Sequence, residues 1–206
     1  MDLPASQIRD MLTRPVTSGE AVHLAGTSVH EPLVLERLDV SSIDFSGSVF
    51  LSRVAFRNVT FTGLSWFRGC LFKAGADFSG ATFTNDARFD GSVFEQPFQF
   101  TQAEVLGATD FNACAFHGAA TFDRSTFCGS LSLEKANFHA TASLRRVECL
   151  GGLWSEGARF ARAITMTGMD VHGRTWLRNV RLGDERGRAG NRVLADSINS
   201  YGYQWT

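Results

Sequence analysis

Hydrophobic positions repeat along this chain with a period of eleven residues. From Phe45 to Phe100, phenylalanines follow one another at alternating intervals of five and six residues. The same spacing continues to Leu182 and gives 26 central positions in all. Ser155 is the one central residue that is not apolar. The residue two positions earlier is usually small or apolar, as at Ala76, and the flanking positions are polar. Each unit is therefore predicted to point two side chains inward and three outward.

The spacing excludes both a long helix and one continuous strand. Steps of five and six residues place successive phenylalanines about 140° and 240° apart around a helix, so they would not share a face. In a strand, an odd step of five reverses the side-chain direction. The chain is therefore predicted to turn between one central residue and the next, which is typical of a solenoid.

The segment Asp77-Phe78-Ser79-Gly80-Ala81-Thr82-Phe83 resembles the pentapeptide repeat family in its Phe-rich variant. The resemblance implies an all-β fold, a right-handed quadrilateral parallel β-helix with four units to a coil, in which the central and the small residues fill the interior. Every second unit here has one extra residue, so we expect a bulged corner twice in each coil of 22 residues.

Three segments follow from where the repeat begins and ends. We expect a cap with a short helix over residues 4–13, since Ile8, Met11 and Leu12 share one side. The β-helix has an irregular first coil and then a regular part, and a linker precedes an apolar tail. The predicted ranges are 1–20 for the cap, 21–184 for the β-helix (regular over 43–184) and 185–206 for the linker and tail.

The apolar residues of the tail need a place to be buried. The first of them are spaced as in a helix. The family resemblance favours a homodimer formed through this tail, and the alternative is a tail that folds back as a cap. The dimer candidates are Val193, Leu194, Ile198, Tyr201, Tyr203 and Trp205.

Composition indicates a folded protein without a membrane span. The chain has 20 basic and 21 acidic residues, and no apolar run approaches the length that a membrane helix needs. No basic flank with an apolar stretch opens the sequence, so we expect a cytoplasmic protein. The four cysteines are expected to be unpaired thiols, because inward Cys70 and Cys114 are two coils apart.

The sequence lacks a phosphate-binding loop, a dinucleotide fingerprint, a zinc-protease motif and Cys-x-x-Cys spacing. No catalytic residue and no cofactor are predicted, and a non-catalytic protein is favoured over an enzyme.

Residues 22 apart are expected to stack on one face, about 4.8 Å apart. Glu95, His117 and His139 form such a column, at a spacing where two imidazoles and a carboxylate could hold a divalent metal. The alternative is a pair of surface histidines that the repeat merely stacks.

Trp154 and Trp176 form a second column, with Trp66 on the same face four coils earlier. Exposed tryptophans often anchor binding partners. Two alternatives are open. A local slip at Ser155 would turn Trp154 into the core, or the aromatic tail would pack over these rings.

Arg124, Arg145 and Arg146 cluster on a third face. Such a patch suits an acidic partner or nucleic acid. The alternative is a solvated surface of mixed charge, since Asp123 and Glu148 lie close to it.

Three functions are compatible with these features. The first is a non-catalytic scaffold for protein–protein interaction. The second, which the family resemblance implies, is protection of DNA gyrase from antibiotics by mimicry of duplex DNA. Residues 43–184 hold 13 acidic and 14 basic side chains, whereas a duplex of similar length, roughly 31 Å, carries about 18 phosphate charges. The third is a small-molecule binder or enzyme at the repeat break near Ser155. Direct nucleic-acid binding is not expected.

Overall fold

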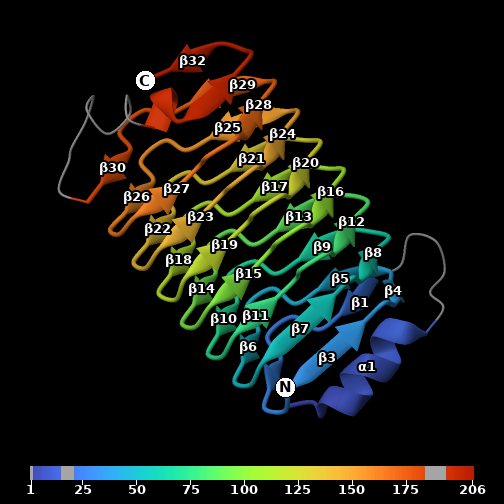
Figure 1. Ribbon diagram of the computed structural model, residues 1–206. Coiled ribbons are helices and arrows are strands. Elements are labelled where there is room, and N and C mark those ends of the chain that lie inside the picture. The colour runs from blue at the N-terminus through green and yellow to red at the C-terminus, as the bar shows by residue number, and fades with distance from the viewer. Residues whose placement is uncertain (1, 15–20, 184–193) are drawn as a thin grey trace.

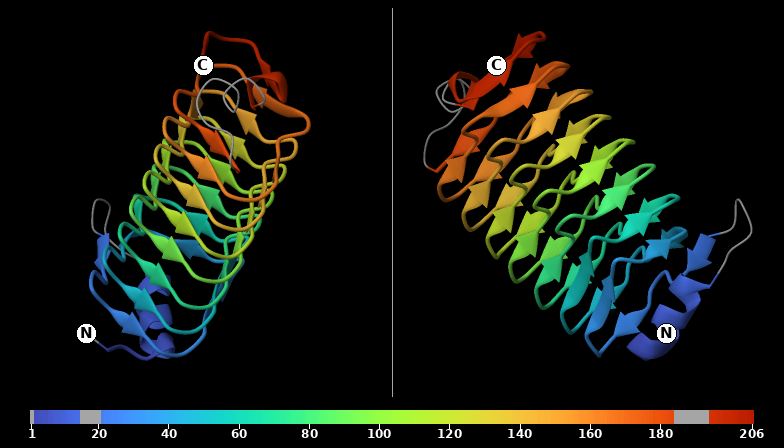
Figure 2. Two further views of the ribbon diagram at one scale, coloured as in Figure 1. Left: turned by 90° about the vertical axis from the view of Figure 1, so that its left-hand side faces the viewer. Right: turned by 45° about the vertical axis from the view of Figure 1, so that its right-hand side comes forward.

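The computed structural model describes residues 2–14, 21–183 and 194–206, and it forms a parallel β-solenoid with one helix at its N-terminal end (Figure 1). Figure 2 shows the coils stacked along one axis, with the two termini at opposite ends. The predicted linker and Val193 lie outside the described residues. No helix in the described ranges is long and apolar enough to cross a membrane.

Four parallel sheets form the four faces of the solenoid. Face 1 contains β1 (Ala21–His23), β5 (Ser42–Asp44), β9 (Ser65–Trp66), β13 (Ala87–Arg88), β17 (Thr109–Asp110), β21 (Leu131–Ser132), β25 (Gly152–Trp154), β29 (Arg174–Trp176) and β32 (Gln204–Trp205). Face 2 contains β2 (Ser28–Val29), β6 (Val49–Phe50), β10 (Leu71–Phe72), β14 (Val93–Phe94), β18 (Ala115–Phe116), β22 (Asn137–Phe138), β26 (Arg159–Phe160) and β30 (Arg181–Leu182). Face 3 contains β3 (Leu33–Glu36), β7 (Val54–Arg57), β11 (Ala76–Asp77), β15 (Phe98–Gln99), β19 (Ala120–Thr121), β23 (Ala142–Ser143) and β27 (Ile164–Thr165). Face 4 contains β4 (Asp39–Val40), β8 (Thr60–Phe61), β12 (Thr82–Phe83), β16 (Glu104–Val105), β20 (Thr126–Phe127), β24 (Glu148–Cys149), β28 (Met169–Val171) and β31 (Ile198–Ser200).

The register between coils is 22 residues, as predicted. Phe72 pairs with Phe50 in the coil before and with Phe94 in the coil after. The rings of Phe72 and Phe94 stack with centroids 4.7 Å apart and planes 7° apart. Each fully buried aromatic ring contributes about 1.5 to 3 kcal/mol, so the column of phenylalanines holds the coils together.

One residue in every eleven adopts a positive φ at a corner, which is how the chain accommodates the extra residue of every second unit. The two bulged corners per coil are thereby confirmed. The residues are Asn58, Gly69, Gly80, Gly91, Gln102, Ala113, Arg124, Lys135, Arg146, Gly157, Gly168 and Asn179.

The N-terminal cap is confirmed. Helix α1 (Ala5–Thr13) buries Ile8 and Leu12 against the end of the first coil, next to β3 and β4. The N–H of Ala5, which has no partner within the helix, donates to Glu31 Oε2 at 3.0 Å. The irregular first coil also forms, with β1 to β4 in sequence over residues 21–40.

The C-terminal tail folds back onto the solenoid. Strand β31 pairs with β28, and β32 pairs with β29. Leu194 and Ile198 are buried in the chain's own core. The helical spacing was misleading for Ile198, because this residue begins a strand. Of the two predictions for the tail, a dimer contact and a cap, the structure shows the tail folded back as a cap.

The strand at the repeat break keeps its register. Trp154 pairs with Ser132 and with Trp176, and the side chains on either side of it, Leu153 and Ser155, are buried. A slip that turns Trp154 into the core is therefore wrong, because Leu153 already fills the interior. Ser155 Oγ lies in that interior without a hydrogen-bond partner in the described residues.

All four cysteines are unpaired thiols, as predicted. Cys70, Cys114 and Cys149 are buried, and Cys128 is half-buried. Burial raises the pKa of the Cys70 thiol to about 12, so this group stays protonated at neutral pH.

Candidate functional site: an arginine-lined hollow

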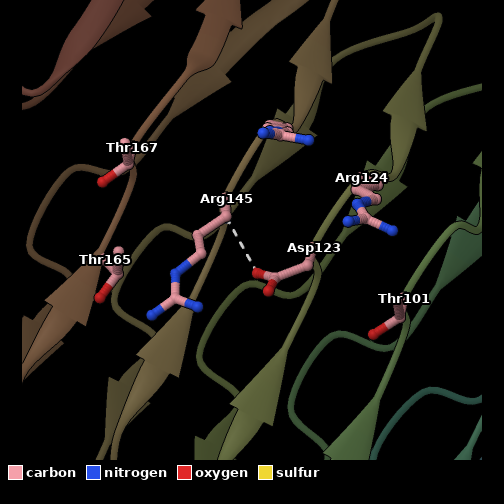
Figure 3. A pocket seen from close by; sticks show the side chains of 7 residues that line it. Thr101, Asp123, Arg124, Arg145, Thr165 and Thr167 are labelled. Atoms are coloured by element: carbon pink, nitrogen blue, oxygen red, sulfur yellow. Dashed lines mark hydrogen bonds between the residues drawn. The ribbon is translucent and has the colours of Figure 1, made fainter.

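A hollow of about 540 Å³ lies on the C-terminal half of face 3, over the corners that follow its strands (Figure 3). We call it the arginine hollow, and it is lined by Thr101, Asp123, Arg124, Arg145, Arg146, Thr165 and Thr167. A second hollow of about 400 Å³ shares Asp123, Arg145 and Thr165 with it. The second hollow is also lined by residues of β19 and β23, namely Ala120, Thr121, Ala142 and Ser143.

The backbone of the corners directs the arginines outward. Arg124 and Arg146 occupy the corner position with φ of 60° and 53°. Gly80, Gly168 and Asn58 hold the same position in other coils, and these are residue types that tolerate a left-handed backbone. Arginine there is not required by the backbone, and both side chains are exposed.

The one carboxylate of the hollow is engaged by groups other than guanidinium. Asp123 Oδ1 accepts the hydroxyl of Ser143 at 2.6 Å and the backbone N–H of Arg145 at 2.9 Å. Figure 3 shows Asp123 between Arg124 and Arg145, with the Arg145 side chain extending away from it. Asp123 therefore holds two coils together and leaves the three guanidinium groups without an ion pair in the described residues.

The rest of the solenoid is different. Every basic side chain between residues 43 and 119 has an ion pair, namely Arg53, Arg57, Arg68, Lys73 and Arg88. Within residues 120–183, by contrast, no lysine or arginine forms one. The hollow thus lies in the part of the rod where positive charge is uncompensated.

The structure brings the predicted histidine column together. His117 and His139 stack with ring centroids 4.5 Å apart and planes 4° apart. The nitrogen lone pairs lie in these parallel planes and do not converge on one point. Glu95 is bound to Lys73 Nζ at 2.8 Å. Among the described residues, no three His, Cys, Asp or Glu side chains are grouped to hold a metal ion.

The tryptophan column packs against the tail. Trp176 lies between Trp154, at a centroid distance of 5.8 Å, and Trp205, at 4.9 Å. The Trp176 Nε1–H donates to Glu156 Oε2 at 3.0 Å. The predicted packing of the aromatic tail over these rings is what the structure shows for Trp205. Trp66 lies apart from them and lines a separate hollow of about 320 Å³.

Thr101, Thr165 and Thr167 line the arginine hollow but were not among the predicted site residues. For Thr165 and Thr167 the signal was present, because Thr167 lies 22 residues after Arg145 of the cluster, and Thr165 lies 22 residues after Ser143, which donates to Asp123. Threonine on a strand surface carries no charge and looks ordinary, so only the three-dimensional arrangement singles these two out.

The family comparison agrees with the repeat. The model for pentapeptide repeats (9 copies) matches residues 39–82, 56–102 and 100–148. No curated protein and no solved structure matches the chain significantly. The matched residues cover more than half of the chain, and the strands continue with the same register beyond them to β30. The chain belongs to the pentapeptide repeat family.

Proposed function

We propose that this protein is a non-catalytic scaffold that docks an acidic segment of a protein partner in the arginine hollow. The observation that carries the proposal is the set of three guanidinium groups, Arg124, Arg145 and Arg146, around one hollow without an ion pair in the described residues. Guanidinium groups bind carboxylates in a planar, bidentate geometry.

The fold supports docking because it is preorganised. The interior beneath the hollow is filled by Phe100, Phe122 and Leu144, each fully buried. A surface that is already rigid loses little conformational entropy when a partner binds.

The charge distribution supports the same partner. Residues 43–119 hold seven acidic and five basic side chains, a net charge of −2, whereas residues 120–183 hold five acidic and nine basic ones, a net charge of +4. A positive half that surrounds the hollow would steer an acidic partner toward it.

We also propose that the protein forms a homodimer through its C-terminal end. Leu194 and Ile198 are buried within the chain, so the remaining candidates are the aromatic residues of the last coil. Tyr201 and Tyr203 are 68% and 78% exposed. Large aromatic side chains of this kind are enriched in protein interfaces.

Protection of DNA gyrase is the alternative proposal and has less support. Mimicry of duplex DNA requires unpaired acidic groups, but Asp77, Asp90, Asp110 and Glu95 are each neutralised by a basic side chain. The row of Glu104, Glu148 and Asp170 on face 4 is the best acidic column available. The site expected near Ser155 loses its basis, since that residue is buried directly after strand β25, which keeps its register.

The scaffold proposal is tested with two variants of equal charge. Arg124→Asn with Arg146→Asn removes two charges from the hollow, and asparagine already occupies this corner at position 58. The control, Arg159→Asn with Arg181→Asn, removes two charges from face 2, where Asn137 holds the same column. Each protein is used as bait in its native cell extract, and a captured partner is then purified and titrated calorimetrically.

We expect the hollow variant to lose the partner and the control to retain it, with affinity at least about tenfold weaker in the hollow variant. A partner bound equally by both variants would refute docking in the hollow. Capture of gyrase subunits, together with rescue of DNA supercoiling from an inhibitor in vitro, would instead establish the alternative.

A further inference from the structure

Side-chain acceptors in one coil repeatedly serve donors in the next coil. In three places an Asp or Asn oxygen accepts the backbone N–H of the residue 22 positions later: Asp86 from Ala108 at 2.9 Å, Asn112 from Glu134 at 3.0 Å and Asp123 from Arg145 at 2.9 Å. In two of them the same oxygen also accepts a hydroxyl from the strand before that N–H: Ser132 for Asn112 and Ser143 for Asp123. The structure thus has a recurrent acceptor position that takes one hydroxyl and one N–H.

The next copy of this donor pair in the arginine hollow has no acceptor. One coil after Ser143 and Arg145 the donors are the hydroxyl of Thr165 and the N–H of Thr167. The residue in the acceptor position is now Arg145, which can only donate. Within the described ranges, neither the Thr165 hydroxyl nor the Thr167 N–H has a hydrogen-bond partner.

These donors face the same hollow as the arginines. Thr165, Thr167 and Arg145 all line it, and Figure 3 shows the Arg145 side chain extending on the side of the two threonines, away from Arg124. A hydroxyl, a backbone N–H and a guanidinium group therefore lie around the place where Asp123 supplies an oxygen one coil earlier. These three groups are all donors, so together they favour binding of an anion with several acceptor oxygens.

We propose that the arginine hollow is a phosphate-monoester site, which takes a phosphorylated serine or threonine of the docked partner. The proposal rests on the proposed function, and it specifies the chemistry of the acidic segment. One phosphate oxygen occupies the position equivalent to Asp123 Oδ1 and accepts from Thr165 and Thr167, and the Arg145 guanidinium binds the other oxygens.

A phosphate monoester fits these donors better than a carboxylate or a phosphodiester does. It presents three strong acceptor oxygens and carries a charge close to −2 at neutral pH. A carboxylate carries one negative charge, so it would compensate less of the positive charge of the three arginines than a phosphate monoester does. A phosphodiester has a single negative charge, whereas the hollow holds three arginines and one aspartate.

The test is a titration of the full-length, ¹⁵N-labelled protein followed by NMR at constant ionic strength. The probes are inorganic phosphate and N-acetyl-phosphoserine amide, with N-acetyl-serine amide and dimethyl phosphate as comparisons. We expect inorganic phosphate and N-acetyl-phosphoserine amide each to shift the Thr167 amide signal in a saturable way. Arg145→Thr should weaken binding at least about tenfold, because it removes the guanidinium group that binds the phosphate oxygens. Threonine is chosen because it holds the equivalent position one coil later.

The control variant Arg159→Asn with Arg181→Asn should bind the probes as the unaltered protein does. The proposal is overturned if the Thr167 amide does not respond, if Arg145→Thr binds phosphate as well as the unaltered protein, or if dimethyl phosphate shifts the signal equally, which would point to nucleic acid. A partner that depends on Arg124 and Arg146 but still binds after phosphatase treatment would leave the scaffold proposal intact and refute the phosphate site. Phosphate binding without any partner that depends on Arg124 and Arg146 would support the phosphate site and refute the scaffold proposal.

Discussion

Phe98 occupies an inward position of face 3 that smaller residues hold in the neighbouring coils. It stands between Ala76 and Ala120 in the strand register. Its ring is fully buried and lies 4.5 Å from Phe94 and 5.5 Å from Phe122, measured between centroids. The small neighbours above and below make room for the ring, so the large residue is part of a packed layer and not an irregularity.

We expect Phe98→Ala to lower the free energy of unfolding by about 3 to 5 kcal/mol, because it leaves a ring-sized cavity in a rigid core. Urea unfolding followed by circular dichroism measures the change. Leu64→Ala is the control, since that side chain is 43% exposed and should cost little. A loss below about 1 kcal/mol would show that the neighbouring phenylalanines collapse into the space.

Asp77 is a buried carboxylate that stabilises the fold through its charge. It binds Arg57 Nε at 2.5 Å and accepts the N–H of Ser79 at 3.0 Å. Burial by itself would raise its pKa, but the hydrogen bonds from Ser79 and Arg57 and the charge of Arg57 outweigh this and lower it. The folded pKa therefore lies below the unfolded one, so the stabilisation is present above the unfolded pKa and is lost as pH falls through the folded value.

We expect Asp77→Asn to reduce the free energy of unfolding at pH 7 by about 1 to 3 kcal/mol. The difference between the two proteins should shrink as the pH is lowered below about 4, where the unfolded carboxyl becomes protonated. Unfolding curves at several pH values test this. A difference that stays constant with pH would mean that packing, and not charge, is what the substitution removes.

At the scale of the element, the corner between faces 4 and 1 depends on stacked glycines. Gly107, Gly129, Gly151 and Gly173 follow at intervals of 22 residues. A Cβ atom on Gly129 would lie 2.6 Å from the carbonyl carbon of Gly107. The backbones of successive coils are therefore in direct contact there, and no side chain fits between them.

We expect Gly129→Ala to destabilise the protein by about 1 to 3 kcal/mol, because the clash is with backbone that cannot move aside. Gly75→Ala is the matched control. Its Cβ would meet only the Pro97 carbonyl oxygen, at 3.6 Å, which is an ordinary contact. Thermal unfolding of both variants measures the difference. Equal melting temperatures would show that the corner can widen.

At the scale of the whole molecule, the two ends of the solenoid are closed differently. Helix α1 covers the first coil, whereas the last coil is completed by β31 and β32 of the tail. This coil leaves aromatic side chains exposed, and His172 stacks on Tyr201 with centroids 5.0 Å apart. The proposed homodimer would use these exposed side chains.

The proposed homodimer predicts a solution mass twice the chain mass of 22.6 kDa. We expect Tyr201→Ser with Tyr203→Ser to give the mass of one chain, because both side chains are exposed in the single chain and would be buried between two copies. Light scattering after size exclusion measures the mass, and circular dichroism checks that the fold is kept. If the unaltered protein is monomeric, or if the variant remains a dimer, the C-terminal interface is refuted.

The arrangement of the coils followed from the sequence, because the solenoid is built from contacts between residues a fixed number apart. The spacing of the phenylalanines implies where the chain turns, and the extra residue of every second unit implies the bulged corners at positions such as Asn58 and Gly69. The same periodicity correctly placed His117 on His139 and Trp154 on Trp176. Local rules suffice where each coil contacts only its neighbours.

The destination of the tail and the chemistry of the hollow were decided only by the tertiary structure. Ile198 and Tyr201 lie beyond the regular repeat, so no fixed spacing related them to β28, and an apolar segment fits a helix, an interface or a further coil equally well. The three arginines were visible in the sequence, but whether each has a partner depends on which side of the corner Asp123 turns to. The Thr165 hydroxyl and the Thr167 N–H lack an acceptor because Arg145 stands where the previous coil has Asp123. Hydrogen bonding between neighbouring coils is a property of the folded chain.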